Sequence, residues 1–148
     1  MPNSFIANFV HCVFATKQRR NLIPAELRPR LHAYLGGIAR KLKINLLVAG
    51  GTANHMHVLL AVPSTMPLAE ALQKLKANSS RWIRDHGIQF EWQEGYGGFS
   101  VSPSLLPVVK TYIENQEEHH RKWSFEDEFR LLLKKSGIAF DDEKLFAA

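Results

Sequence analysis

Apolar residues in this chain fall into two kinds of pattern, short continuous runs and stripes at three- and four-residue spacing. The runs at 5–16, 44–49 and 55–62 are rich in Phe, Val, Leu and Ile, and they predict strands. Residues 90–101, interrupted by glycines, predict a loop and a short fourth strand. Two stripes predict helices, the first through Leu27, Leu31, Leu35, Ile38 and Leu42, the second through Leu68, Leu72, Leu75, Trp82 and Ile83.

The resulting order is β-α-β-β-α-β, followed by further helices after residue 101. This order predicts an α+β fold of the ferredoxin-like type, in which four antiparallel strands carry two helices on one face. We expect residues 1–101 to form this core, and residues 102–148 to form the C-terminal helices and a tail that belong to the same single domain. RNA-recognition modules share the plan, so the fold alone does not decide the function.

The third run begins with His55-Met56-His57, directly after a turn containing Gly50, Gly51 and Asn54. Side chains alternate between the faces of a strand, so His55 and His57 point to the same side. Two imidazoles in this arrangement can bind one metal ion if a third ligand joins them. The alternative is a pair of surface or hydrogen-bonded core histidines without a metal.

Tyr112 and Gln116 are four residues apart in a predicted helix and therefore lie on one face. A tyrosine hydroxyl can act as a nucleophile, and an amide oxygen can complete a metal site begun by imidazoles. The alternative is an amphipathic core tyrosine with a surface amide. His119 and His120 follow, and His120, one turn beyond Gln116, is the nearer candidate; both also suit a helix C-terminus.

Composition describes an ordinary globular chain of 148 residues with a net charge of +5. A single cysteine, Cys12, excludes an internal disulfide framework, and no targeting or membrane-spanning segment is recognisable, so we expect a soluble cytoplasmic protein without a membrane partner. Residues 1–113 carry 13 Lys and Arg against 5 Asp and Glu, whereas residues 114–148 carry 6 against 9. The basic part favours a polyanion partner, although a merely soluble basic domain has the same composition.

Several stretches in this order closely resemble the HUH single-tyrosine transposases of the insertion-sequence-200/605 type and their REP-associated relatives. The stretches are HCVFATKQRR, GGTANHMHVLL, WQEGYGGFSVS and YIENQEEHHRKWSFEDEFRLLLKKSGI, and together they extend over nearly the whole chain. One departure is Asn54, where many relatives have an acidic residue before the first histidine.

The resemblance implies that His55, His57 and Gln116 hold one divalent metal, Mg²⁺ or Mn²⁺. It also implies that Tyr112 attacks a phosphodiester of single-stranded DNA with hairpin ends, leaving a 5′-phosphotyrosine and a free 3′-hydroxyl. Relatives act as dimers, so a homodimer is expected. Candidate contacts to the DNA backbone are Lys17, Arg19, Arg20, Lys74, Lys76, Arg81 and Arg84.

A free tyrosine has a pKa near 10, and no dedicated base for Tyr112 is recognisable in the sequence. Three other functions stay open. A ferredoxin-like nucleic-acid-binding module would need no metal and no Tyr112. A domesticated nuclease would act on repeated chromosomal hairpins without moving itself, and a metal-dependent phosphodiesterase using activated water would form no covalent adduct.

Overall fold

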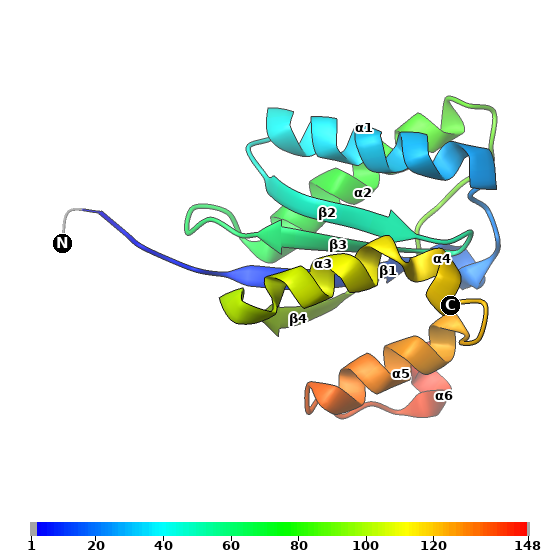
Figure 1. The fold of residues 1–148 in the computed structure, drawn as a ribbon. Helices are drawn as coiled ribbons and strands as arrows, with labels where there is room; N and C mark the ends of the chain where they lie inside the picture. Colours follow the sequence, from blue (N-terminus) through cyan, green and yellow to red (C-terminus); the bar gives the residue numbers. More distant parts are fainter. Residues whose placement is uncertain (1–2, 148) are drawn as a thin grey trace.

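A four-stranded antiparallel sheet forms the centre of the molecule, which the computed structural model describes for residues 3–147 (Figure 1). The strand order is β2-β3-β1-β4, as expected of the ferredoxin-like plan. β1 lies between β3 and β4, with His11 opposite Leu59 and Val13 opposite His57. The strands are β1 (Phe9–Ala15), β2 (Asn45–Gly51), β3 (His55–Ala61) and β4 (Gly97–Val101).

Two helices, α1 (Arg28–Lys41) and α2 (Leu68–Arg84), cover one face of the sheet (Figure 1). Alternate residues of the central strands point toward α1 and α2, and in β3 these are Met56, Val58 and Leu60. The larger hydrophobic core lies between the sheet and these two helices. The apolar stripes predicted for both helices face this core.

The C-terminal helices lie on the opposite face of the sheet (Figure 1). β2 and α3 approach so closely at Gly50 that a Cβ atom built there would lie 2.1 Å from the carbonyl oxygen of Ile113. Gly50 therefore allows direct backbone packing of α3 on the sheet. The elements of this layer are α3 (Leu106–Glu114), α4 (Gln116–His119), α5 (Phe125–Lys135) and α6 (Asp142–Leu145).

The α+β ferredoxin-like prediction, with C-terminal helices carrying the tyrosine, is confirmed, while some boundaries differ. β1 begins at Phe9 instead of residue 5 because its neighbour β3 ends at Ala61, opposite Phe9; the side chain of Phe5 is 78% exposed. Residues 25–27 form a short 3₁₀ turn, η2 (Ala25–Leu27), and α1 begins beside Pro29, a position where proline is tolerated.

Short 3₁₀ turns also connect the other elements, namely η1 (Lys17–Arg19) after β1 and η3 (Pro103–Leu105) before α3. Within residues 3–147, none of the helices combines the length and apolar character needed to span a bilayer.

Candidate metal and tyrosine site

β3 directs both predicted histidines toward the layer of C-terminal helices, where their side chains are fully buried. His55 Nε2 lies 3.0 Å from Gln116 Oε1, and His57 Nε2 lies 3.0 Å from Glu128 Oε1. Their alternation on the strand therefore places both Nε2 atoms beside oxygen atoms of neighbouring helices.

The other ring nitrogen of each histidine has a partner of its own. His55 Nδ1 lies 2.9 Å from both Asn54 Oδ1 and Thr52 Oγ1, and His57 Nδ1 lies 2.7 Å from His11 Nε2. An imidazole that binds a metal ion through Nε2 carries its proton on Nδ1, and Asn54 and His11 are placed to accept the hydrogen bond from that Nδ1–H. Asn54 thus supplies an uncharged acceptor beside His55 Nδ1.

Burial keeps the imidazoles of His55 and His11 neutral. It lowers the pKa of His55 to about 3, and the pKa of His11 likewise to about 3, with the nearby His57 acting in the same direction. A neutral imidazole is the form that binds a metal ion.

Glu128 of α5 lies at the centre of the cluster, with a side chain only 2% exposed. Its Oε1 atom is 3.0 Å from His57 Nε2, 3.1 Å from His120 Nε2 and 3.5 Å from His55 Nε2. Burial raises the pKa of this carboxyl, but hydrogen bonds from His120 and His57 outweigh burial and hold the pKa well below its usual range. Glu128 is therefore an anion at neutral pH.

One ligand atom from each of His55, His57, His120 and Glu128 lies within 4.8 Å of the others. The amide oxygen of Gln116, 1% exposed, adjoins the group, 3.0 Å from His120 Nε2 as well as from His55. Buried imidazole nitrogens and a carboxylate oxygen that converge on one point form a donor set suited to a divalent first-row metal ion. The group is a candidate metal centre.

Tyr112 of α3 joins the same cluster, because its hydroxyl donates a hydrogen bond to Glu128 Oε2. Burial, then this hydrogen bond and the charge of Glu128, raise the pKa of Tyr112 well above its ordinary value of 10. The helix carrying Tyr112 was predicted to continue past Gln116, but it breaks at Asn115, which has φ −101° and ψ 25°. The break separates α3 from α4 without separating Tyr112 from Gln116, whose Nε2 donates to the Tyr112 carbonyl at 3.4 Å.

The predicted basic residues divide into two groups. Lys17, Arg19 and Arg20 lie in or beside η1, which adjoins the β2–β3 turn through a bond from Asn54 Nδ2 to the Arg19 carbonyl at 3.4 Å. This group is near the histidines. Lys74, Lys76, Arg81 and Arg84 belong to α2, on the opposite face of the sheet.

All four members of the α2 group already have partners in this structure, and Arg81 donates to Asn78 Oδ1 and Arg84 to the Ser80 hydroxyl. The Lys76 ammonium donates to the carbonyl oxygens of Gln93 at 2.8 Å and Gly95 at 3.0 Å, while Lys74 pairs with Glu70 at 3.4 Å. Lys76 therefore holds the segment before β4 in place, and its contact with DNA stays a prediction.

Two site residues were not predicted from the sequence, His11 and Glu128. His11 lies on the same face of β1 as Val13 and Ala15. Its contact with His57 in β3 can be known only from the register of the two strands. Glu128 left a clearer signal, because it lies on the apolar stripe of α5 with Phe125 and Leu132. A carboxylate on a buried helix face is costly unless it is paired, so it indicates a specific partner.

The fold and the site together define a class of protein in which a ferredoxin-like sheet carries a histidine pair and a helix above it carries a tyrosine. Residues 6–116 match the family described as Transposase IS200 like. The chain belongs to this family of IS200-like transposases. The match includes Tyr112 and Gln116 and ends before Glu128.

Individual proteins are similar to this chain over most of its length. The chain is 27% identical over 119 residues to the transposase for insertion sequence element IS200 of Salmonella typhimurium, covering 75% of this chain and 78% of that protein, and the Salmonella typhi transposase gives the same values. A structure titled as a transposase of Deinococcus radiodurans R1 superposes with a TM-score of 0.60 at 22% identity, over 77% of this chain and 95% of that one. A REP-associated tyrosine transposase bound to a REP hairpin gives 0.59 at 15% identity, over 95% and 90%.

Proposed function

We propose that this transposase cuts and rejoins single-stranded DNA through a covalent 5′-phosphotyrosine intermediate formed on Tyr112. One observation carries the proposal: Tyr112 and His57 both contact the carboxylate of Glu128, the tyrosine hydroxyl at Oε2 and the imidazole Nε2 at Oε1. A nucleophile and a candidate metal centre are thereby held on the same buried face, as attack on a phosphodiester requires.

The bond changes balance without a nucleotide cofactor. Tyr112 Oη forms a bond to phosphorus, the bond from phosphorus to the 3′ oxygen breaks, and a 3′-hydroxyl leaves. The hydroxyl proton passes from Tyr112 toward the solvent or an acceptor such as Glu128, and the 3′ oxygen takes up a proton. Attack of a 3′-hydroxyl on the phosphotyrosine reverses the process, so the phosphodiester is conserved for rejoining.

The proposed metal ligands are His55, His57 and Gln116, with His120 and Glu128 completing the donor set. A bound Mg²⁺ or Mn²⁺ would neutralise charge on the phosphate and on Glu128, the carboxylate that raises the pKa of Tyr112. Imidazole ligands favour Mn²⁺ over Mg²⁺, which prefers oxygen ligands. Asn54 and His11 orient the two imidazoles through their Nδ1 atoms.

The proposed substrate is single-stranded DNA with a hairpin. The basic character of residues 1–113 supports a polyanion partner, and the REP-associated relative is bound to a hairpin. Lys17, Arg19 and Arg20 are the candidate backbone contacts nearest the site. We also propose a homodimer.

Incubation with end-labelled hairpin DNA from the sequence flanking the gene, with Mn²⁺, tests the proposal. Wild type should form a denaturant-resistant protein–DNA adduct, and Tyr112→Phe should form none. Tyr34→Phe is the matched control, since Tyr34 stacks on Trp82 on the opposite face of the sheet and its variant should retain the adduct.

Two outcomes contradict the proposal. Cleavage without an adduct in both wild type and Tyr112→Phe would indicate a phosphodiesterase that activates water. Hairpin binding with neither product, in Mn²⁺ and in Mg²⁺, would indicate a nucleic-acid-binding module.

A further inference from the structure

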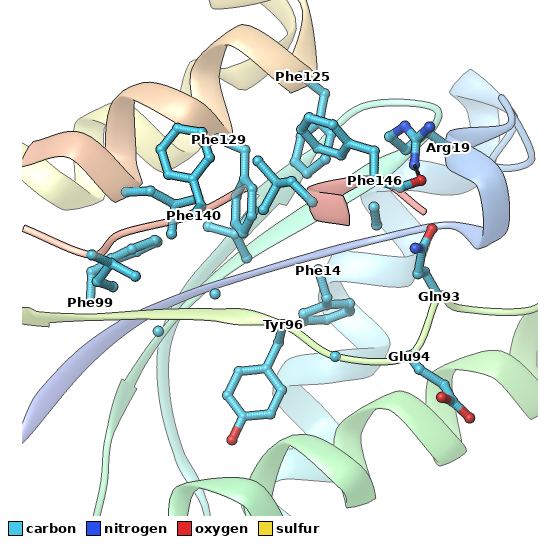
Figure 2. A pocket seen from close by; sticks show the side chains of 18 of the residues that line it. Phe14, Arg19, Gln93, Glu94, Tyr96, Phe99, Phe125, Phe129, Phe140 and Phe146 are labelled. Atoms are coloured by element: carbon cyan, nitrogen blue, oxygen red, sulfur yellow. Dashed lines mark hydrogen bonds between the residues drawn. The ribbon is translucent and has the colours of Figure 1, made fainter. Parts of the chain in front are cut away.

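A cavity of about 390 Å³ lies between the β1–β4 side of the sheet and the α5–α6 segment (Figure 2). This volume lies within the range of small-molecule sites in proteins. Aromatic rings from several elements line it, and Figure 2 shows those of Phe125, Phe129 and Phe146 gathered on one side, where their ring centroids lie 5.7–6.5 Å from one another. The rings that line the cavity include those of Phe99, Phe125, Phe129, Phe140 and Phe146.

The cavity contains one polar atom that lacks a partner. Within residues 3–147, Gln93 Oε1 is the buried side-chain oxygen without a hydrogen-bond donor, and Gln93 lines the cavity. The other amide atom, Nε2, donates to the Ala147 carbonyl at 3.2 Å, which fixes Oε1 as the acceptor. A buried acceptor without a partner is unfavourable, so the site is suited to a ligand that brings an N–H group.

A positively charged side chain, Arg19, also lines the cavity. The guanidinium of Arg19 packs over the Phe146 ring at 4.8 Å, donates through Nη1 to the Phe146 carbonyl at 3.1 Å and pairs through Nε with Glu126 at 3.4 Å. The N–H groups of Nη2 remain for a ligand. Arg19 and the preceding Gln18 both have positive φ, 54° and 55°, a conformation that is costly for residues other than glycine. Such strain persists where the surroundings impose it, often at ligand sites.

The cavity shares walls with the tyrosine and metal site. The ring of Phe125 lies 4.6 Å from the ring of His55, centroid to centroid, and Phe99 lies 6.2 Å from His11. A single layer of side chains therefore separates the cavity from the candidate metal centre. A DNA strand with a phosphate at Tyr112 would have neighbouring nucleotides close to the cavity.

We propose that the cavity binds one unpaired nucleobase of the DNA strand, beside the phosphate that Tyr112 attacks; this inference rests on the proposed function. The aromatic walls provide stacking surfaces for a base. Gln93 Oε1 accepts from an N–H group of the base, and Arg19 neutralises an adjacent phosphate. A wholly apolar ligand would leave Gln93 without a donor and gain nothing from Arg19.

The test is a scan with abasic sites. Hairpin oligonucleotides with single-stranded arms, taken from the DNA flanking the gene, would carry one abasic nucleotide at each arm position in turn. Affinities would be measured by fluorescence anisotropy in Mn²⁺ with the Tyr112→Phe variant, because this substitution prevents cleavage. Loss of the base at one position beside the cleavage site should weaken binding about tenfold, the scale of one base stacked on aromatic rings.

Two variants should change that penalty. Ala139→Trp adds an indole at the cavity wall and should bind intact and abasic DNA alike, whereas Gln93→Leu deletes the acceptor at similar volume but keeps the aromatic rings, so it should reduce the penalty. Ala33→Trp, on the exposed side of α1, should keep the penalty. Gln93→Leu should also leave the melting temperature nearly unchanged, because Oε1 has no partner to lose and the Nε2 bond to the Ala147 carbonyl that it does lose is exposed to solvent.

An abasic penalty that is the same in Gln93→Leu and Ala139→Trp, or that appears at no position, would overturn the inference. The readout is binding and does not depend on covalent chemistry. A cavity-dependent penalty without any Tyr112 adduct would contradict the proposed function and leave the base-binding site standing. A Tyr112 adduct without the abasic penalty would contradict the base-binding site and leave the proposed function standing.

Discussion

Substitution of Gly50 by alanine should displace the helix that carries Tyr112. A Cβ atom at position 50 would lie 2.1 Å from the Ile113 carbonyl oxygen, whereas ordinary contacts begin at 3.4 Å. The obstacle is backbone, which no rotamer change can move, so α3 must shift by about 1 Å. Ile113 follows Tyr112 directly, and a displacement of this size from the reacting phosphate costs about 10²-fold in rate.

The same clash should cost about 1–3 kcal/mol of the free energy of unfolding, as overpacking does elsewhere. For a chain of this length that lowers the melting temperature by roughly 3–10 °C, which leaves a folded protein to assay. The measurements are the single-turnover rate of adduct formation in Mn²⁺ and the thermal unfolding curve. Circular dichroism would verify that the variant is folded at the assay temperature.

Gly36→Ala is the matched control. Gly36 lies within α1, nothing comes within 4 Å of a Cβ atom built there, and alanine favours the helix. This variant should gain about 0.5–1 kcal/mol in stability and keep the wild-type rate. A Gly50→Ala protein that forms the adduct within twofold of the wild-type rate would refute the packing argument, whatever its stability.

Three further predictions concern metal binding, acid stability and the cysteine. Mn²⁺ at about 100 times its dissociation constant should raise the free energy of unfolding by about 2.7 kcal/mol, seen as a rise in melting temperature; Glu128→Gln should weaken binding by about tenfold or more, whereas His86→Ala, on an exposed residue, should not. Burial lowers the pKa values of His11 and His55 to about 3. In metal-free protein, prepared with EDTA, the unfolded chain therefore binds more protons than the folded chain below pH 6.5. The free energy of unfolding from urea titrations should therefore fall between pH 6.5 and pH 3, and less steeply in His11→Gln; equal slopes would contradict this. Burial raises the pKa of Cys12 to about 12, so iodoacetamide at pH 8 should label the thiol only after denaturation, as mass spectrometry would report.

The sequence allowed the sheet plan and several members of the site to be predicted, His120 among them. Strand alternation placed His55 and His57 on one face, and helical spacing placed Tyr112 beside Gln116, and these four side chains do lie together. Their chemical roles stay predictions. The helix break at Asn115 was not foreseen, because the residue is compatible with a helix interior and the break depends on packing against the sheet.

Glu128 and His11 could not be placed from local pattern alone. The contact between His11 and His57 arises from pairing of strands 46 residues apart, and Glu128 reaches the site only through the docking of α5. Long-range packing of this kind leaves little trace in local periodicity. The buried carboxylate in the apolar stripe of α5 was the one available signal.

The most direct test of the account is to identify the atoms joined in the adduct. Wild-type protein would be incubated with hairpin DNA and Mn²⁺, digested with protease and nuclease, and analysed by mass spectrometry, while the released strand would be offered to a DNA polymerase. The account predicts a nucleotide linked through its 5′ phosphate to the peptide containing Tyr112, and a released strand with an extendable 3′-hydroxyl. A linkage to any other residue, or a 3′-phosphate on the released strand, would contradict it.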